Sequence, residues 1–306
     1  MSQAQNYKSL WDFKASTTQG AMIAVDGSDS EEVVRLTGAY TARQVSAALD
    51  LRPTDRVLEL GCGVGRIGRE LAPKVAHWHG ADISANMLKV AGERLAGCAN
   101  VGFTELTRAS LQPLSDASFD KAYCVAVFIH MDKEDFYLYL EDLARVLKPG
   151  GLLYFDTWNL ASAVGWRRYA MECNQYRSAD PTQRKDVARN QFSTPDEVRA
   201  FLEHAGFRTL ALYADSPWVQ AIAMRGDGDA AAQTRRIEGA AARIAYSPLW
   251  TQLFSTMMQV LAEGTLSPAE GLKALHDDAR GEEVALFRAV YGEVVRQRQA
   301  AHGAAM

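Results

Sequence analysis

Short apolar runs alternate with amphipathic stretches between residues 55 and 225. The apolar runs predict strands at residues 56–60, 75–81, 101–106, 119–125, 152–156, 207–213 and 218–224. The amphipathic stretches predict helices at residues 65–72, 85–96, 133–147 and 195–204. Strands that alternate with helices form a mostly parallel sheet covered by helices on both faces. The pattern therefore predicts an α/β fold, a doubly wound and mostly parallel sheet of seven strands.

Two of the predicted helices have clear end signals. The Lys-Pro-Gly-Gly run at 148–151 ends the helix that begins near residue 133. The Thr-Pro-Asp-Glu run at 194–197 combines an N-cap residue, a first-turn proline and two acids near the positive end of the helix dipole. These signals mark where the first of these helices ends and where the second begins.

Three segments do not follow this alternation, and they divide the chain around a central domain at residues 55–225. Residues 1–54 contain an aromatic stretch followed by an amphipathic one that predicts a helix at residues 31–49, and we expect this segment to form an N-terminal helical cap or lid. Residues 158–194 form a long connection without a strand signal, and connections of this length often form lids over active sites. Residues 226–306 begin with a Gly/Asp linker and predict a helical C-terminal extension.

A cluster of glycines follows the first predicted strand, where the chain must turn into a helix. Glycine there allows positive φ and lets the backbone approach a ligand closely, while free helix N–H groups create a positive end. Gly63, Gly65 and Gly68 also fit the GxGxxG pattern of dinucleotide-binding proteins. Asp82 lies at a suitable distance for a ribose contact in either case. The turn alone leaves both cofactors open, as well as a tight turn without a ligand.

Four motifs in a fixed order narrow this choice. They are VLELGCGVGR at 57–66, GADIS at 80–84, SDASFDKAYC at 115–124 and LKPGGLLYF at 147–155. Over roughly residues 55–225 the chain resembles the class I S-adenosylmethionine (SAM)-dependent methyltransferases, in particular the subgroup that acts mostly on small molecules. The resemblance implies a Rossmann-like methyltransferase fold with SAM as cofactor and S-adenosylhomocysteine (SAH) as product.

The resemblance also implies roles for individual residues. Glu59 would face the methionine end of SAM, and the Cys124 carbonyl would accept a hydrogen bond from its ammonium group. Asp82 would accept hydrogen bonds from both ribose hydroxyls, unless it is a helix cap instead. Ile83 would lie against the adenine, with Met87 at its edge. The cofactor-binding set implied in this way is Glu59, Gly61, Cys62, Gly63, Gly65, Arg66, Asp82, Ile83, Met87, Arg108, Ala109, Ser110, Cys124 and Val125.

One position departs from the family pattern. Family members commonly carry an acid after the third strand, which accepts a hydrogen bond from the adenine amino group. Arg108 stands at that position here, and a guanidinium has no acceptor. Either Ser110 or a backbone carbonyl takes this role, or the adenine is held more loosely.

Methyl transfer needs a base only when the nucleophile must lose a proton. His130 follows the fourth strand, where related enzymes often place a histidine, and imidazole titrates close to neutral pH. Asp156 ends the fifth strand, at the edge where open α/β sheets bind ligands. His130 is therefore a candidate base and Asp156 a second candidate catalytic group. A packing histidine and a capping aspartate are the alternatives.

Aromatic side chains in the predicted lids are candidates for contact with the methyl acceptor. They are Tyr7, Trp11, Trp158, Tyr169 and Tyr176, with simple packing as the alternative. His77 and His79 share one face of the second strand, but the sequence offers them no third ligand. We therefore expect no metal site.

Composition and charge limit the partners. The chain has 306 residues, 48% hydrophobic, with 33 Lys and Arg against 37 Asp and Glu, for a formal net charge of −4. A weakly acidic chain is a poor binder of nucleic acid, because such binding depends on clustered cations. The four cysteines form no CxxC pair, and we find neither a membrane-spanning run nor a signal peptide. We expect a cytoplasmic protein that binds neither nucleic acid nor membrane.

These expectations combine into one hypothesis with two alternatives. The protein would be an enzyme that transfers the methyl group of SAM to an O, N or C nucleophile of a small-molecule metabolite. Alternatively, it would use SAM for aminocarboxypropyl transfer or cyclisation, or it would be a non-catalytic, methyltransferase-like partner subunit. Residues 226–306 would cover the acceptor site or form a homodimer.

Overall fold

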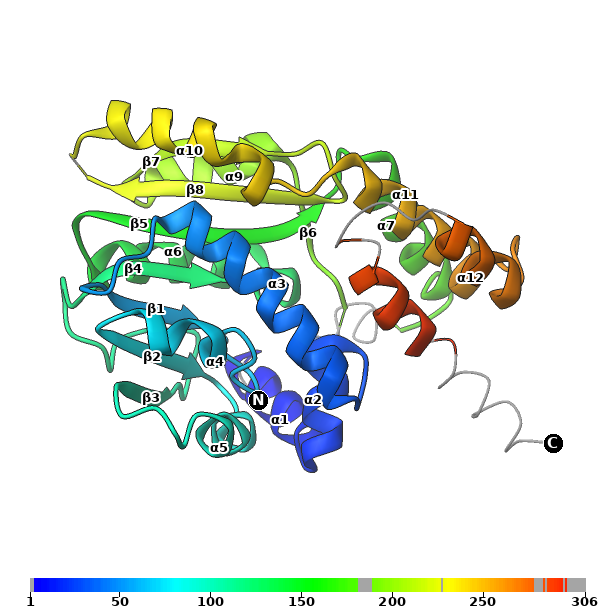
Figure 1. The fold of residues 1–306 in the computed structure, drawn as a ribbon, viewed down its shortest axis with the longest axis horizontal. Helices are drawn as coiled ribbons and strands as arrows, with labels where there is room; N and C mark the ends of the chain where they lie inside the picture. The colour runs from blue at the N-terminus through cyan, green and yellow to red at the C-terminus, as the bar shows by residue number, and fades with distance from the viewer. Residues whose placement is uncertain are drawn as a thin grey trace.

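The computed structural model describes residues 3–180, 189–226, 228–277, 283, 285–293 and 295 of the chain. At its centre, seven strands lie in the order β3-β2-β1-β4-β5-β8-β7, and an eighth, β6, pairs with β5 (Figure 1). Their bounds are β1 Arg56–Leu60, β2 His77–Asp82, β3 Val101–Glu105, β4 Phe119–Cys124, β5 Leu147–Asn159, β6 Phe192–Ser193, β7 Phe207–Tyr213 and β8 Trp218–Arg225. The prediction of a doubly wound, mostly parallel sheet is confirmed.

The strand order places a ligand site at the centre of the sheet. Strand β1 pairs in parallel with both β2 and β4, so that Glu59 lies opposite Gly80 on one side and Tyr123 on the other. The chain moves outward from β1 in one direction through β2 and β3, and in the other through β4 and β5. Open sheets of this kind bind ligands beside the carboxyl ends of the strands at such a switch point.

Helices cover both faces of the sheet (Figure 1). On one face lie α3 (Glu31–Leu49), α4 (Gly68–Leu71) and α10 (Ala230–Ile244), which share a hydrophobic core with β1, β2 and β4. On the other face α6 (Lys133–Val146) and α9 (Pro195–His204) form a second core. Helix α5 (Ala85–Arg94) packs against β2 and β3. Within the described part of the chain, no helix is both long and apolar enough to cross a bilayer.

The 147–159 region differs from the prediction of a turn followed by a short strand. Strand β5 takes in the Lys-Pro-Gly-Gly run, because Leu147 pairs with Phe119 and Leu152 already pairs with Lys121. The residues between them bulge from the ladder, and Gly150 adopts a φ of 77° there. The predicted strandless connection at 158–194 likewise contains α7 (Ala163–Gln175) and the short β6, while residues 181–188 lie outside the described residues.

The N-terminal segment consists of three helices. Helix α3 has the predicted bounds and begins at Ser30, whose Oγ accepts a hydrogen bond from the Val33 N–H. Helices α1 (Gln3–Lys14) and α2 (Thr18–Asp26) do not pack on the sheet core but against α5, near the carboxyl ends of the strands. They are therefore placed to cover the ligand site.

The predicted boundary at residue 226 falls inside a shared core. Helix α10 buries Ile237 and Ile244 against the sheet face that α3 also covers, so it belongs to the central domain. Helices α11 (Pro248–Met258) and α12 (Pro268–Asp277) form a separate apolar cluster with Phe287 and Tyr291, and α11 also contacts α7. Part of the segment after residue 277 lies outside the described residues.

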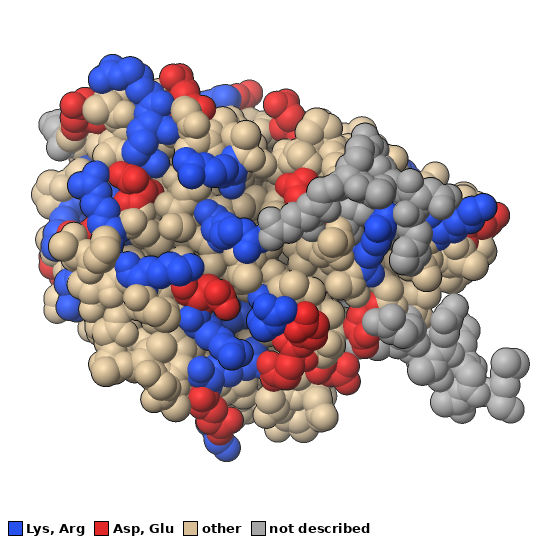
Figure 2. Space-filling model, viewed as in Figure 1, with Lys and Arg blue, Asp and Glu red and all other residues tan. Residues whose placement is uncertain are grey.

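A polar groove runs between α3 and α10, on the face where Figure 2 shows many Lys and Arg side chains. Its charged lining residues are Arg43, Asp50, Lys74, Arg236, Arg243 and Glu283. Arg236 donates hydrogen bonds to the carbonyls of Ala47 and Ala48, both at 2.9 Å, in the last turn of α3. Because a helix C-terminus carries partial negative charge, Arg236 stabilises the end of α3.

Candidate cofactor site

A cavity of about 180 Å³ lies beside the carboxyl ends of β1, β2 and β4, under α1 and α2. It is lined mainly by apolar groups. The lining residues are Tyr7, Trp11, Ala24, Val25, Glu59, Leu60, Gly61, Cys62, Gly63, Arg66, Ile67, Asp82, Ile83, Met87, Leu106, Ala109, Val125, Ala126, Val127, Ile129, His130, Met131 and Tyr139. The cavity therefore lies where the switch point of the sheet places a ligand.

The glycine turn after β1 forms the floor of this cavity. Gly61 has a φ of 69°, and a Cβ there would lie 2.3 Å from Cγ2 of Val127, so a side chain is excluded on two grounds. Gly65 also has a positive φ, but its missing Cβ makes room for Leu95 and Ala91 of the α5 region. Gly65 lies outside the cavity lining, and its role is to let the turn pack against the helix.

Asp82 ends β2 and is buried, with 8% of its surface exposed. Its Oδ2 accepts a hydrogen bond of 2.8 Å from the Gly63 N–H, and its Oδ1 accepts one of 2.9 Å from the Ser84 N–H. A carboxylate has about four acceptor positions, so about two remain after these contacts. Burial raises the pKa of Asp82, while the backbone N–H groups lower it. Asp82 thus ties the turn to α5 and retains acceptors for a ligand.

Glu59 lies beneath the turn and is 3% exposed. Its Oε2 accepts a 2.6 Å hydrogen bond from the Tyr123 hydroxyl, which in turn accepts one from the Trp78 indole at 3.0 Å. Burial raises the pKa of Glu59 to about 8, although the Tyr123 hydrogen bond and the charge of Arg66 both lower it. A cation entering the cavity would favour the ionised form of this carboxyl.

Arg66 lines the same cavity, but its charge is already partnered. Its Nε lies 3.4 Å from Oδ1 of Asp26 on α2, and both side chains are at least 90% buried. Thr37 donates a 2.7 Å hydrogen bond to Oδ2 of the same aspartate. This ion pair holds the N-terminal helices against the glycine turn.

The wall expected to face the adenine is apolar. Ile83, Met87, Leu106 and Ala109 line it, and a tyrosine of α6, Tyr139, completes it. The sequence did not predict Tyr139 as a site residue. Its position one helical turn after Phe136, on the buried face of the predicted helix, is the signal that places it there.

Two residues assigned to the adenine side lie outside the cavity lining. Arg108 is exposed and donates a hydrogen bond to the Gln112 side chain. The Ser110 hydroxyl donates to Asp142 at 2.8 Å. Neither side chain therefore replaces the acid that the family carries, because both are directed away from the cavity.

The turn after β4 forms the next part of the wall. Val125 and Ala126 line the cavity, whereas Cys124 is buried just before them. Ala126 has a φ of 57°, an uncommon value for a residue with a side chain. Its N–H donates a 2.7 Å hydrogen bond to Oδ1 of Asp156, which is buried and does not line the cavity. Asp156 supports this turn, and burial raises its pKa to about 6.

His130 lies in the cavity wall, at the end of a short 3-10 helix (Phe128–His130). Its Nδ1 is buried and has no hydrogen-bond partner in the described part of the chain. Burial, aided by the charge of Lys14, lowers the pKa of His130 to about 4, below the near-neutral value expected of a free imidazole. The ring is therefore neutral at pH 7 and offers an acceptor or donor for a ligand.

Helix α1 brings two predicted aromatic residues into the cavity. Trp11 meets the His130 ring in a T-shaped contact with centroids 4.9 Å apart, and Tyr7 lines the same end. The Tyr7 hydroxyl accepts a hydrogen bond of 3.2 Å from the Asp132 N–H.

The other three predicted aromatic residues do not line the cavity. Trp158 stacks on Trp218, with ring centroids 4.4 Å apart. Tyr169 contacts Phe192 edge-on, and Tyr176 lies under the guanidinium of Arg189 at 4.5 Å. They pack beside β5 and α7.

Polar contacts that the sequence did not predict hold α1 over the cavity. The Lys8 ammonium donates to the Ile83 carbonyl at 3.1 Å and to Glu105 at 2.6 Å. Asp12 accepts a 2.7 Å hydrogen bond from the Ser84 hydroxyl. An isolated Lys or Asp in a helical stretch gives no signal for such contacts, which depend on how α1 docks.

The two histidines of β2 are accounted for without a metal. His79 Nε2 lies 2.8 Å from the Thr104 hydroxyl, and its ring is 5.8 Å from that of His77. The described residues contain no group of three or more His, Cys, Asp or Glu side chains placed to hold a metal ion.

Fold and site together fit a SAM-type cofactor. The switch-point cavity provides a turn without side chains, a buried carboxylate with remaining acceptors, a second buried acid and an apolar wall. In their chemistry these groups suit a ribose diol, the ammonium group of an amino acid and a purine base. They are the features that the resemblance to class I SAM-dependent methyltransferases predicts.

Comparison with known proteins agrees. A family model described as a methyltransferase domain matches residues 57–151 of the chain. The Methyltransferase GfsG of Streptomyces halstedii is 36% identical over 119 residues, which cover 38% of this chain and 42% of that protein. A ubiquinone biosynthesis O-methyltransferase of Paraburkholderia phymatum is 30% identical over 161 residues, or 50% of this chain and 65% of that protein.

The similarity to these relatives is confined to part of each protein. This chain spans less than two thirds of the length of either relative. Among solved structures, the protein in complex with the Haloferax volcanii Trm112 methyltransferase activator has a TM-score of 0.51 at 16% identity. That match covers 68% of this chain and 97% of that protein, and it shows the fold alone.

Proposed function

We propose that this protein transfers the methyl group of SAM to a nucleophile on a small molecule. The observation that carries the proposal is Asp82, a buried carboxylate held by the Gly63 and Ser84 N–H groups with acceptors left over. When bound, SAM supplies a methyl group already activated on a sulfonium sulfur. The protein then needs chiefly to align the acceptor and to exclude water.

Each end of the cavity has a proposed task. Asp82 binds the ribose, Glu59 the cationic amino-acid end, and the wall of Leu106 and Ala109 the adenine. His130 and Trp11 face the acceptor, and the free Nδ1 of His130 accepts a hydrogen bond from its hydroxyl or amine. Asp156 supports the Val125–Ala126 turn through the 2.7 Å contact described above and acts through that turn.

Oxygen is the nucleophile that we favour. Two kinds of relative are named O-methyltransferases, one from Aspergillus sclerotiorum and several from ubiquinone biosynthesis. A neutral His130 suits a hydroxyl acceptor, because it can take a hydrogen bond from the O–H as the proton is lost. We further propose a small-molecule acceptor and a cytoplasmic location.

Titration calorimetry with SAH tests the cofactor assignment. We expect binding to the folded protein at micromolar concentration, and absence of binding at high micromolar SAH would refute the assignment. Mass spectrometry of metabolite extracts, incubated with SAM carrying a deuterated methyl group, then tests the reaction. Label in a metabolite supports methyl transfer, whereas label in methylthioadenosine indicates aminocarboxypropyl transfer or cyclisation. Binding without any turnover would favour the partner-subunit alternative.

The C-terminal helices have a separate proposed role. No described residue after 226 lines the cavity, so we propose that α11 and α12 contribute to a homodimer and do not cover the acceptor. Light scattering on the full chain tests this proposal. A monomer would refute it.

A further inference from the structure

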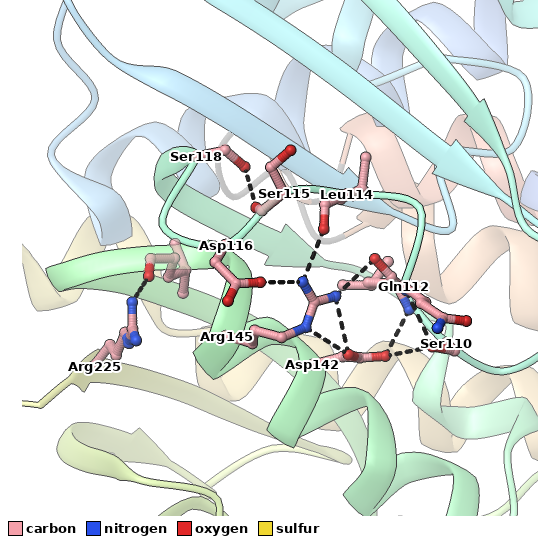
Figure 3. A network of polar contacts seen from close by, with 11 residues as sticks. Ser110, Gln112, Leu114, Ser115, Asp116, Ser118, Asp142, Arg145 and Arg225 are labelled. Atoms are coloured by element: carbon pink, nitrogen blue, oxygen red, sulfur yellow. Dashed lines mark hydrogen bonds and ion pairs between the residues drawn. The ribbon is translucent and has the colours of Figure 1, made fainter.

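A network of polar contacts joins α6 to the loop after β3 (Figure 3), and this loop also carries Ala109 of the cavity wall. Asp142 on α6 accepts hydrogen bonds at Oδ2 from the Ser110 hydroxyl at 2.8 Å and from the Leu111 N–H at 2.6 Å. Its other oxygen, Oδ1, accepts a 3.1 Å hydrogen bond from Nε of Arg145. One carboxylate thus joins the helix to the loop after β3.

Arg145 holds the same loop further along the chain. Its Nη2 donates to the Leu111 carbonyl at 2.8 Å, and its Nη1 donates to the Leu114 carbonyl at 2.8 Å and to Asp116 at 2.7 Å. These main-chain groups belong to a loop, where no strand pairing satisfies them. A planar guanidinium can serve these two carbonyls and the two carboxylates, of Asp116 and Asp142, at once, and a lysine ammonium cannot reproduce this geometry.

The loop held in this way carries the wall. Leu106 and Ala109 line the cavity from one side, and Leu111 and Leu114 anchor the loop in the core on the other. Between them, the loop has no regular secondary structure of its own. The position of Ala109 against a ligand therefore depends on the contacts made by Asp142 and Arg145.

We propose that Asp142 and Arg145 are positioning residues for the base of the cofactor. Because Arg108 stands where an acid is expected and points away from the cavity, this chain holds the base by the shape of an apolar wall. The two α6 residues fix that wall from behind. This role rests on the proposed SAM site. Asp142 and Arg145 do not touch the ligand, and they affect its affinity through the wall that contacts the adenine.

Binding of two ligands separates this role from a merely structural one. Adenosine occupies only the nucleoside end of the site, whereas SAH occupies both ends. Arg145→Lys keeps the charge but loses the planar set of contacts. Asp142→Asn leaves one oxygen, so its NH₂ group must face either the two loop donors or Nε of Arg145. We expect each variant to weaken adenosine and SAH by the same factor, about tenfold. In steady-state assays KM for SAM should rise while kcat stays unchanged.

Two control variants complete the design. Asp116→Asn alters a contact of Arg145 whose acid side chain is 76% exposed, and we expect wild-type affinity for both ligands. Glu59→Gln changes the amino-acid end, so SAH should weaken while adenosine binds as before. All titrations are made well below the thermal midpoint of each variant, so that folded fractions are equal.

The outcomes distinguish the two proposals. If the wild type binds neither SAH nor adenosine, the proposed function fails. If the wild type binds both, and folded Arg145→Lys and Asp142→Asn bind them equally well, the positioning role is overturned. A loss confined to SAH would also overturn it, because the effect would then lie at the other end of the cavity.

Discussion

Replacing Asp82 by asparagine is the most direct perturbation of the cofactor site. Each carboxylate oxygen accepts one backbone hydrogen bond, Oδ1 from Ser84 and Oδ2 from Gly63, and each keeps an acceptor for one ribose hydroxyl. An amide has one oxygen, so its NH₂ group must face one of these backbone donors. Asp82→Asn therefore loses a turn contact and one ribose contact together.

The size of the effect follows from these contacts. A hydrogen bond to a charged group contributes about 1.5–3 kcal/mol. Losing the ribose contact on one oxygen should thus reduce SAH affinity about 10- to 100-fold, since 1.4 kcal/mol corresponds to a factor of ten. The unsatisfied N–H of the turn should lower the free energy of unfolding by about 1–3 kcal/mol as well.

Calorimetry with SAH and denaturant unfolding measure the two quantities separately. Asp120→Asn is the matched control, because Asp120 also accepts a backbone N–H, from Arg56 at 2.9 Å, but at the opposite end of the sheet. The control should lose stability and keep its SAH affinity. If Asp82→Asn binds SAH as tightly as the wild type does, the ribose assignment is wrong.

Three further predictions concern other charges in or near the cavity. The pKa of Glu59 is raised to about 8, so below that pH a ligand with a positive charge beside Glu59 must displace a proton from it. SAH affinity should therefore rise from pH 6 to pH 8, by up to about tenfold per pH unit. Glu59→Gln should abolish this pH dependence. His130→Ala should lower kcat about 10²-fold and leave SAH affinity unchanged, because His130 serves the acceptor; equal losses in both would contradict this. Asp26→Asn leaves the buried Arg66 charge without its carboxylate and should lower the free energy of unfolding by about 3 kcal/mol, whereas Asp196→Asn, in an exposed surface pair, should not.

The central sheet was predictable because its signals are local. Apolar runs, helix caps and glycine turns each act within a few residues, and they placed β1, α3 and β4 correctly or within a residue. The Lys-Pro-Gly-Gly run misled because proline and glycine usually end an element. Here the pairing of Leu147 with Phe119 and of Leu152 with Lys121 keeps the strand continuous around a bulge. Such pairing is a tertiary fact that no single segment contains.

The cofactor end of the cavity was easier to predict than the acceptor end. Glu59, Gly63 and Asp82 come from motifs fixed to strand ends, and the sheet brings strand ends together whatever the loops do. The acceptor end depends on which helix docks over the cavity. Tyr7 and Trp11 reach it because α1 docks on α5, whereas Trp158 lies on the strand end that packs against Trp218. Aromatic composition alone could not separate these cases.

The charges around the cavity explain why its occupant should be a cation. Two buried carboxyl groups, Glu59 and Asp82, line it, and the cation beside them, Arg66, already pairs with Asp26. Burying ionised groups without compensation is costly, and the raised pKa values of both acids express that cost. A ligand with a positive charge beside Glu59 offsets this cost, because it stabilises the ionised carboxylate of Glu59. A neutral ligand of the same shape does not. The site therefore favours a sulfonium nucleoside over an uncharged analogue of equal size, and the preference should grow as the pH rises to about 8 and Glu59 becomes ionised, and then level off.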